Sequence, residues 1–555
     1  MSSTRMPSPA SSSSNGASPP TKPTFATQLS EGRPPFSLLH EILFLSLIVS
    51  TQLLAQAGLG QVIAPLHIIG PQLGTRDPGQ LSWMPAAYSL TIGTFILISG
   101  RLGDVYGHRR LLVVGFTWYA VASLGAGLCA YDRHSPIPFD VLRALQGIGP
   151  GLLLPNALAI LGRTYKPGLR KALVFAIYGG SAPTGFILGA TFSSLVAQLA
   201  WWPWAYWLTT IVCAALAIGS PFIVPADHDA VPHLDFGETA KRLDLVGSSI
   251  GILGLCLFNV AWNQAPLVGW QTSYVIVFLV VGIALIAAFL VVETKVAHPI
   301  LPWKTFSSEA SFVLACVGAG WSSFGVWMYY WYQIQQIIEG DSPLLATAKN
   351  SPVCLAGMTA AMFCFYFITR LQSSLLMMLS MCGFLSGNLL MALKPAHQIY
   401  WAQTFVATLT TPWGMDISFP SATLILSNAM PVEHQGMAGS LVATMVNYGI
   451  SIGLGIAGTV EVHTNRAGTD TLRGFRGALF SGVGLAGFAL LTSVAFFVFE
   501  SAQSRGKGTL RADEHEREHE PKRMMVDGRD DAANGEAAPD ADASRANPMK
   551  PPRDT

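Results

Sequence analysis

Long apolar stretches alternate with short polar connectors from about residue 37 to residue 499. Most stretches hold about 20 residues, the length at which a helix crosses a hydrocarbon layer of about 30 Å. We therefore predict membrane-spanning helices. The first six are expected at 37–59, 81–100, 111–130, 139–161, 172–199 and 204–223. Two follow at 245–262 and 274–292, and six more at 312–334, 353–369, 375–393, 400–426, 437–460 and 477–499.

This order of six, two and six spans predicts an all-α membrane protein of fourteen transmembrane helices with two six-helix bundles. Small residues are dense inside the spans and allow the close helix packing that a polytopic bundle in lipid requires. The ends of the chain are poor in apolar residues and are expected to be disordered and cytosolic. The expected parts are an N-terminal arm (1–35), an N-terminal bundle (36–224), connectors with two extra helices (225–308), a C-terminal bundle (309–500) and a tail (501–555).

Composition and charge agree with a membrane location. Hydrophobic residues make up 51% of the 555 residues and charged residues only 12%, about half the charged share of an average soluble domain. The formal net charge of +1 gives no reason to expect a nucleic-acid partner. Lys and Arg gather in every second connector, which orients both termini toward the cytosol by the positive-inside rule.

The cysteines do not indicate a metal or disulfide site. All seven lie within apolar runs and lack the spacing of a metal-binding or disulfide framework. We interpret them as small apolar residues and expect no cofactor and no metal. The chain also lacks a phosphate-binding loop for ATP and a dinucleotide fingerprint, so an enzyme is not expected.

The connector GRLGDVYGHRR (100–110) carries the most distinctive pattern. A cluster of arginines there can simply fix the orientation of the chain. The spacing of Gly100, Asp104, Gly107, Arg109 and Arg110, however, resembles the loop between the second and third spans of the major facilitator superfamily. The resemblance implies two pseudo-symmetric bundles and a charged latch that holds one conformation and breaks in another, with the glycines allowing a tight turn.

Two further spans support this resemblance. The fourth, VLRALQGIGPG, matches a family pattern through Arg143 and Gln146. An arginine inside an apolar helix is costly, so we expect it to serve a partner or a pathway, here by tuning proton transfer; the alternative is that it extends to the nearby interface. The fifth span, GGSAPTGFILGA, resembles the motif of proton-exchanging drug exporters. The residues that match it are Gly179, Pro183, Gly185 and Gly189.

Fourteen spans with an inserted central pair resemble the fungal fourteen-helix drug:proton antiporter branch, of the aminotriazole-resistance type. That resemblance implies secondary active export of a small toxic compound, drug or secondary metabolite in exchange for protons, by alternating access of two bundles. The alternative is proton-coupled uptake of a nutrient or metal chelate. A non-transporting receptor is a third hypothesis. The plasma membrane is the expected location, and the vacuolar membrane is the alternative.

Asp416 is the clearest acid at membrane depth, because it lies midway through the twelfth span between Pro412 and Pro420. Burial disfavours the charged form of a carboxylate, which suits a reversible proton carrier. The competing interpretation is a helix-capping or salt-bridged aspartate at a break between the prolines.

Polar residues facing a central cavity are the candidates for substrate contact, although several of them can instead form hydrogen bonds between helices. The candidates are Gln52, Gln56, Asn156, Trp327, Tyr330 and Asn447. The expected partners are therefore a small molecule, protons and the lipid bilayer. One chain contains both bundles, so we expect a monomer.

Overall fold

The computed structural model describes residues 34, 36–132, 134–166, 168–226, 243–296, 308–368, 370–428 and 437–519. Within these residues, 13 helices are long and apolar enough to cross a membrane. A further helix, α16 (Gln403–Asn428), is just as long at 26 residues but richer in Thr, Ser and Pro. The 13 apolar helices and α16 together confirm the predicted fourteen-helix fold. The expected N-terminal arm and most of the tail lie outside the described residues.

The first half of the chain forms the first six crossings. Their helices are α2 (Leu38–Ile63), α4 (Pro78–Tyr106), α5 (His108–Leu128), α6 (Ile137–Thr164), α7 (Leu169–Leu199) and α8 (Pro203–Ile223). Ser37 and Asp77 begin α2 and α4 because their side chains accept the backbone N–H of the third residue that follows, at 3.2 and 3.0 Å. Pro65 separates α2 from the short helix α3 (Leu66–Gln72).

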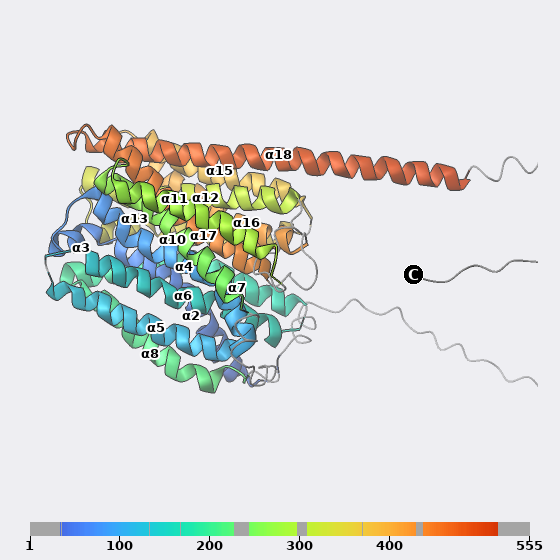
Figure 1. Ribbon diagram of the computed structural model, residues 1–555, viewed down its shortest axis with the longest axis horizontal. Coiled ribbons are helices and arrows are strands. Elements are labelled where there is room, and N and C mark those ends of the chain that lie inside the picture. Colours follow the sequence, from blue (N-terminus) through green and yellow to red (C-terminus); the bar gives the residue numbers. More distant parts are fainter. Residues whose placement is uncertain are drawn as a thin grey trace, which may run out of the picture. The chain divides into compact units, whose positions relative to one another are not determined.

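The second half follows an inserted helical hairpin. The hairpin is α10 (Leu245–Val268) and α11 (Ser273–Glu293), and α10 packs against both α4 and α17. The remaining helices are α12 (Ser308–Gln333), α13 (Pro343–Asn350), α14 (Pro352–Phe367), α15 (Ser373–Ala392), α16, α17 (Ala438–Thr464) and α18 (Thr471–His519). A π-helical turn, Ile334–Ile338, extends α12. Figure 1 shows most of these helices side by side.

Several helices differ from the predicted spans. The second span runs on to Tyr106, so most of the expected loop is helical and Gly107, with a φ of 94°, makes the turn. The tenth predicted span matches α14, but the crossing begins earlier, at Pro343 with α13, and is broken at Ser351, where Pro352 begins α14. The last helix continues to His519, so residues 501–519 of the expected disordered tail are helical. A run of Glu, Arg and Ala before Pro521 favours this extension of the helix, because these residues have high helix propensity.

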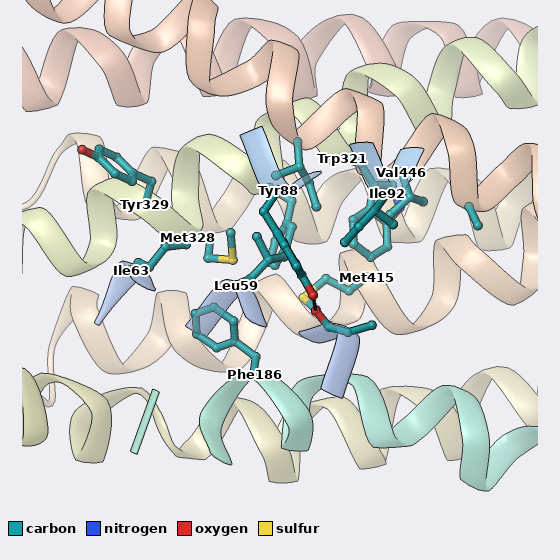
Figure 2. Packing of buried hydrophobic residues seen from close by; sticks show 14 of the residues in the cluster. Leu59, Ile63, Tyr88, Ile92, Phe186, Trp321, Met328, Tyr329, Met415 and Val446 are labelled. Carbon is teal, nitrogen blue, oxygen red and sulfur yellow. Dashed lines mark hydrogen bonds between the residues drawn. The ribbon is translucent and has the colours of Figure 1, made fainter. Parts of the chain in front are cut away.

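The two halves share one apolar core. Figure 2 shows where residues of both halves pack together at the centre of the fold; those from the first half are Leu59, Ile63, Tyr88, Ile92 and Phe186. Their neighbours from the second half are Trp321, Met328, Tyr329, Met415 and Val446. By their contacts, Met1–Phe497 group into one compact unit and Val498–Thr555 into a second.

Candidate functional site

Asp416 lies near the middle of α16 and reaches the boundary between the two halves. The residue is only 9% exposed, and its Oδ2 atom has no hydrogen-bond partner among the described residues. A Cβ atom built on Gly357 of α14 would lie 2.7 Å from this oxygen and 2.8 Å from Cγ of Pro183 on α7. The structure therefore brings Asp416 together with the proline of the predicted antiporter-type motif.

The surroundings of Asp416 suit the neutral form of its side chain. A carboxylate without a partner costs about 5 kcal/mol to bury, whereas a protonated carboxyl carries no net charge to desolvate. Loss of the proton therefore requires water or a cation to reach the group. A group of this kind can take up a proton in one arrangement of the helices and release it in another.

Arg143 is fully buried inside the first half and joins three helices. Its Nε atom donates to the carbonyl of Met84 on α4 at 3.1 Å, and Nη2 donates to the carbonyl of Gly58 on α2 at 2.7 Å. Nη1 donates to Gln146, and the guanidinium lies 4.3 Å from the ring centre of Tyr88. These contacts all stay in the first half. The structure does not bring Arg143 to Asp416 among the described contacts, so direct tuning of that acid has no contact to support it.

The predicted latch is held mainly within the first half. Asp104 accepts a hydrogen bond from Arg163 of α6 at 3.2 Å and lies 3.3 Å from Nε2 of the buried His108. Arg109 donates to the carbonyl of Val224 at 3.2 Å, after the end of α8. Because Asp104 and Arg163 are largely exposed, their ion pair contributes only about 0–1 kcal/mol.

The remaining latch residues lie near the turn between α4 and α5. Arg110 is exposed. Gly100 faces α17, where a Cβ atom on it would lie 3.6 Å from Oγ of Ser440. Its neighbour Arg101 reaches across to Sδ of Met437 at 3.8 Å. The C-terminal end of α4, at the predicted cytosolic face, thus touches the second half as well as its own.

The glycines of the antiporter-type motif separate into two groups. Cβ atoms on Gly185 and Gly189 would lie 2.5 and 2.2 Å from backbone carbonyl oxygens of α2, so these residues allow α7 to contact α2 closely. A Cβ atom on Gly179 would meet nothing within 4 Å. Pro183 instead faces the second half.

The substrate candidates occupy different environments. Gln52 and Gln56 are half-buried on α2. Asn156 donates to Oγ of Ser99 at 3.0 Å and pairs with His108, so its amide links α4 to α6. Three others are buried in the second half. Nε1 of Trp327 has no hydrogen-bond partner within the described part of the chain, Tyr330 donates to a carboxylate, and Asn447 donates to the carbonyl of its own helix at Ala443.

The carboxylate that Tyr330 contacts was not expected from the sequence. Glu461 is 4% exposed, and its Oε2 atom accepts the Tyr330 hydroxyl at 2.7 Å. The residue follows the predicted end of the thirteenth span by one position, where the polarity pattern assigns it to a loop. A helix continued by one turn, to Thr464, is what buries it.

A second unexpected cluster binds α2 to α7 near the predicted cytosolic face. Arg170 donates to both carboxylate oxygens of the buried Glu41, each at 2.6 Å. Tyr165 also donates to Glu41, at 3.0 Å. Burial raises the pKa of the Tyr165 phenol, so it stays a donor. Bidentate pairs of this kind are among the stronger charge-assisted contacts.

The two halves also meet near the predicted outer face. Nε2 of His67 on α3 donates to Oε1 of Gln333 at 2.6 Å, and Gln336 donates to the carbonyl of Ala64 at 2.7 Å. Burial lowers the pKa of His67, so the ring is neutral at this contact. Within the described residues, no group of three or more His, Cys, Asp or Glu side chains could hold a metal ion.

Comparison with known proteins agrees with this architecture. A "Low affinity ammonium transporter" of Saccharomyces cerevisiae is 51% identical over 464 residues, which cover 83% of this chain and 89% of the relative. "Efflux pump terJ" of Aspergillus terreus is 43% identical, with coverage of 85% and 90%. The "Aminotriazole resistance protein" of S. cerevisiae is 35% identical, with coverage of 83% and 84%.

These relatives confirm the resemblance to fungal efflux-type transporters, with an ammonium transporter among them. Residues 45–454 match the Major Facilitator Superfamily. The match spans most of the first half, the inserted hairpin and the second half as far as α17, and it includes the latch, Arg143, Pro183 and Asp416. The chain is therefore a multi-pass membrane transporter that belongs to the Major Facilitator Superfamily.

Proposed function

We propose that this transporter exports a small toxic organic compound from a fungal-type cell in exchange for protons. The two halves rock about the central core and expose a midplane site to one side at a time. Asp416 carries the proton, and the plasma membrane is the site of export. One chain supplies both halves, so the working unit is a monomer.

The observation that carries this proposal is the position of Asp416. Its unpartnered oxygen lies against Gly357 of the second half and near Pro183 of the first. A proton acceptor at the boundary of two moving halves can link protonation to their relative movement. The named efflux and resistance functions of two relatives support export as the direction.

Arg143 has a different part in this proposal. Its hydrogen bonds to α2, α4 and α6 keep the first half rigid while the halves move. The ion pair of Asp104 with Arg163 joins α4 to α6 at the cytosolic end of the first half, and the contact of Arg101 with Met437 joins that end to the second half in the present arrangement.

Transport by purified protein in lipid vesicles tests the proton exchange. With aminotriazole as the probe, acid inside the vesicle is expected to drive accumulation of the compound inside, because protons leave as it enters. Asp416→Asn, which cannot release a proton, is expected to reduce this accumulation at least tenfold. Asp132→Asn, which alters an exposed acid in a connector, is the matched control and is expected to keep it. If Asp416→Asn accumulates aminotriazole as well as the intact protein does, Asp416 is not the proton carrier.

Uptake of a small cation is the second candidate function, because a relative at 51% identity is named an ammonium transporter. Proton symport would reverse the sign of the vesicle experiment, since acid outside the vesicle would drive accumulation. Methylammonium is the probe for this case. Accumulation of methylammonium with acid outside, together with no response of aminotriazole, would replace export by uptake.

A further inference from the structure

Three helices converge on one glycine at the boundary of the halves. Gly357 of α14 leaves room for Oδ2 of Asp416, which belongs to α16, and for the ring of Pro183, which belongs to α7. A Cβ atom at this position would approach both within 2.8 Å, closer than real Cβ contacts allow. The seam between α7 and α14 can therefore close over Asp416 only because residue 357 has no side chain.

We propose that Gly357 is a positioning residue that makes closure of the seam between α7 and α14 depend on the protonation of Asp416. The inference rests on the proposed function, because it uses Asp416 as the proton carrier. It assigns to Gly357 a role that lies outside the motifs described above.

The dependence follows from desolvation. A neutral carboxyl can be covered by the ring of Pro183 and the backbone of Gly357 at little cost. When the O–H bond breaks and the proton passes to water, the remaining carboxylate needs water molecules to replace the lost solvation. Proline has no N–H group, and the backbone N–H of Gly357 lies inside α14, where it serves the helix. The seam must therefore part to admit water, and α7 moves with the first half.

Other titratable groups near Asp416 do not supply the same response. Among the described residues, the groups that interact with it electrostatically are the thiols of Cys354 and Cys364 on α14. From α7 the contact is Pro183, which has no titratable group. Cysteine replacement in the test below removes both thiols, so a response that persists there comes from the carboxyl group.

Spin-label distances across the seam test the proposal without any substrate. All seven cysteines are first replaced, and labels are then placed on Leu173→Cys of α7 and Met362→Cys of α14, which are both exposed. A second pair, Leu199→Cys and Leu355→Cys, reports on the other end of the seam. Distances are measured for the purified protein in lipid nanodiscs between pH 5 and pH 9.

Both substitutions are expected to suppress the pH response of the label distances, but they hold the seam in opposite states. In the labelled protein without further substitutions, at least one of the two spin-label distances is expected to be shorter at acid pH than at alkaline pH. Asp416→Asn, always neutral, keeps the acid distance at every pH. Gly357→Ala, whose methyl group holds the seam open, keeps the alkaline distance, so that its pH response falls at least threefold. Gly180→Ala is the control, because a Cβ atom there has its nearest neighbour, Cβ of Ala361 across the same seam, 3.9 Å away. It is expected to keep the full response.

Two results would overturn the inference. One is a pH response in Gly357→Ala equal to that of Gly180→Ala, and the other is a seam that does not respond to pH before Gly357 is changed. If proton-driven transport persists in either case, the proposed function holds, but the seam between α7 and α14 does not take part in it. If transport in vesicles ignores the proton gradient while the seam still responds, the proposed function fails and the seam contact remains.

Discussion

At the scale of single residues, the polar groups inside this protein differ in how well they are satisfied. Arg143 has acceptors for several of its N–H groups, and all of them are neutral: two backbone carbonyls and the Gln146 side chain. Asp416 has an oxygen to which no residue that the structure describes donates a hydrogen bond. A buried group with fixed partners is suited to holding helices together, whereas one without them is suited to a change of state.

The first residue-scale prediction concerns Arg143. Arg143→Met removes the guanidinium and with it the side-chain hydrogen bonds to the carbonyls of Gly58 and Met84. A hydrogen bond to a charged group contributes about 1.5–3 kcal/mol, so we expect a clear loss of thermal stability. The measurement is the apparent Tm of the purified protein in detergent. Arg473→Met, at an exposed position, is the control and should leave the Tm unchanged. An unaltered Tm in Arg143→Met would contradict a structural role.

A buried acidic residue can be recognised in the sequence only where it stands inside the apolar run that marks its helix. Asp416 is predictable because it stands between two prolines in the middle of an apolar run. Glu461 is not, because it stands one position past the point where the apolar run stops. Its burial depends on Tyr330, which lies 131 residues earlier. Pairing across such separations follows from tertiary packing and leaves no local signal.

At the scale of elements, glycine sets how closely α2 and α7 approach each other. Gly60 of α2 and Gly185 and Gly189 of α7 each face backbone of the other helix at distances that exclude a side chain. Helices in lipid gain little from the hydrophobic effect when they pair, so close van der Waals packing of this type supplies much of the association.

Gly189→Ala tests this contact. The new methyl group would lie 2.2 Å from the carbonyl oxygen of Ala57, so one helix must move. Overpacking of this kind costs about 1–3 kcal/mol. We expect a lower apparent Tm and a smaller monodisperse fraction on size-exclusion chromatography. Gly179→Ala, on the same helix but facing open space, should match the unchanged protein. Equal behaviour of the two variants would show that the contact tolerates a side chain.

Helix positions are predictable from apolar periodicity, but helix breaks and extensions depend on local chemistry. Pro65 separates α2 from α3 after the first crossing, and Pro352 begins a new helix within the tenth crossing. The end of α4 lies within a charged stretch that resembles a loop by composition. It stays helical to Tyr106 because its carbonyls are satisfied up to Gly107, which donates to Gly103 at 2.9 Å. The pattern alone does not distinguish such a helix end from a loop.

At the scale of the whole molecule, the halves touch at several depths between the two membrane faces. His67 and Gln333 meet near the predicted outer face, and Arg101 and Met437 meet near the predicted cytosolic face. Between them, Gly93 of α4 contacts the backbone of Tyr448 on α17, where a Cβ atom would lie within 2.7 Å. Alternating access requires the contacts at one end to separate while those at the other persist.

Cross-linking tests that requirement. His67→Cys with Gln333→Cys, in a cysteine-free background, places a thiol on each half at the outer contact. A short bifunctional thiol reagent is expected to reduce aminotriazole transport at least tenfold, and cleavage of the linker is expected to restore it. Tyr131→Cys with Trp201→Cys joins two neighbouring positions within the first half and should leave transport intact. Undiminished transport through the cross-linked outer contact would show that this contact does not open.

The inserted hairpin restricts how a compound dissolved in the lipid can enter. Oγ of Ser451 on α17 lies 3.0 Å from the carbonyl of Ala86 on α4 and 2.8 Å from Oδ1 of Asn259 on α10. Asn263 of α10 also donates to the carbonyl of Ser451, at 3.2 Å. These bonds hold α10 against α17, and α17 against α4. A compound dissolved in a membrane leaflet can therefore enter on this side only if the hairpin separates from these helices.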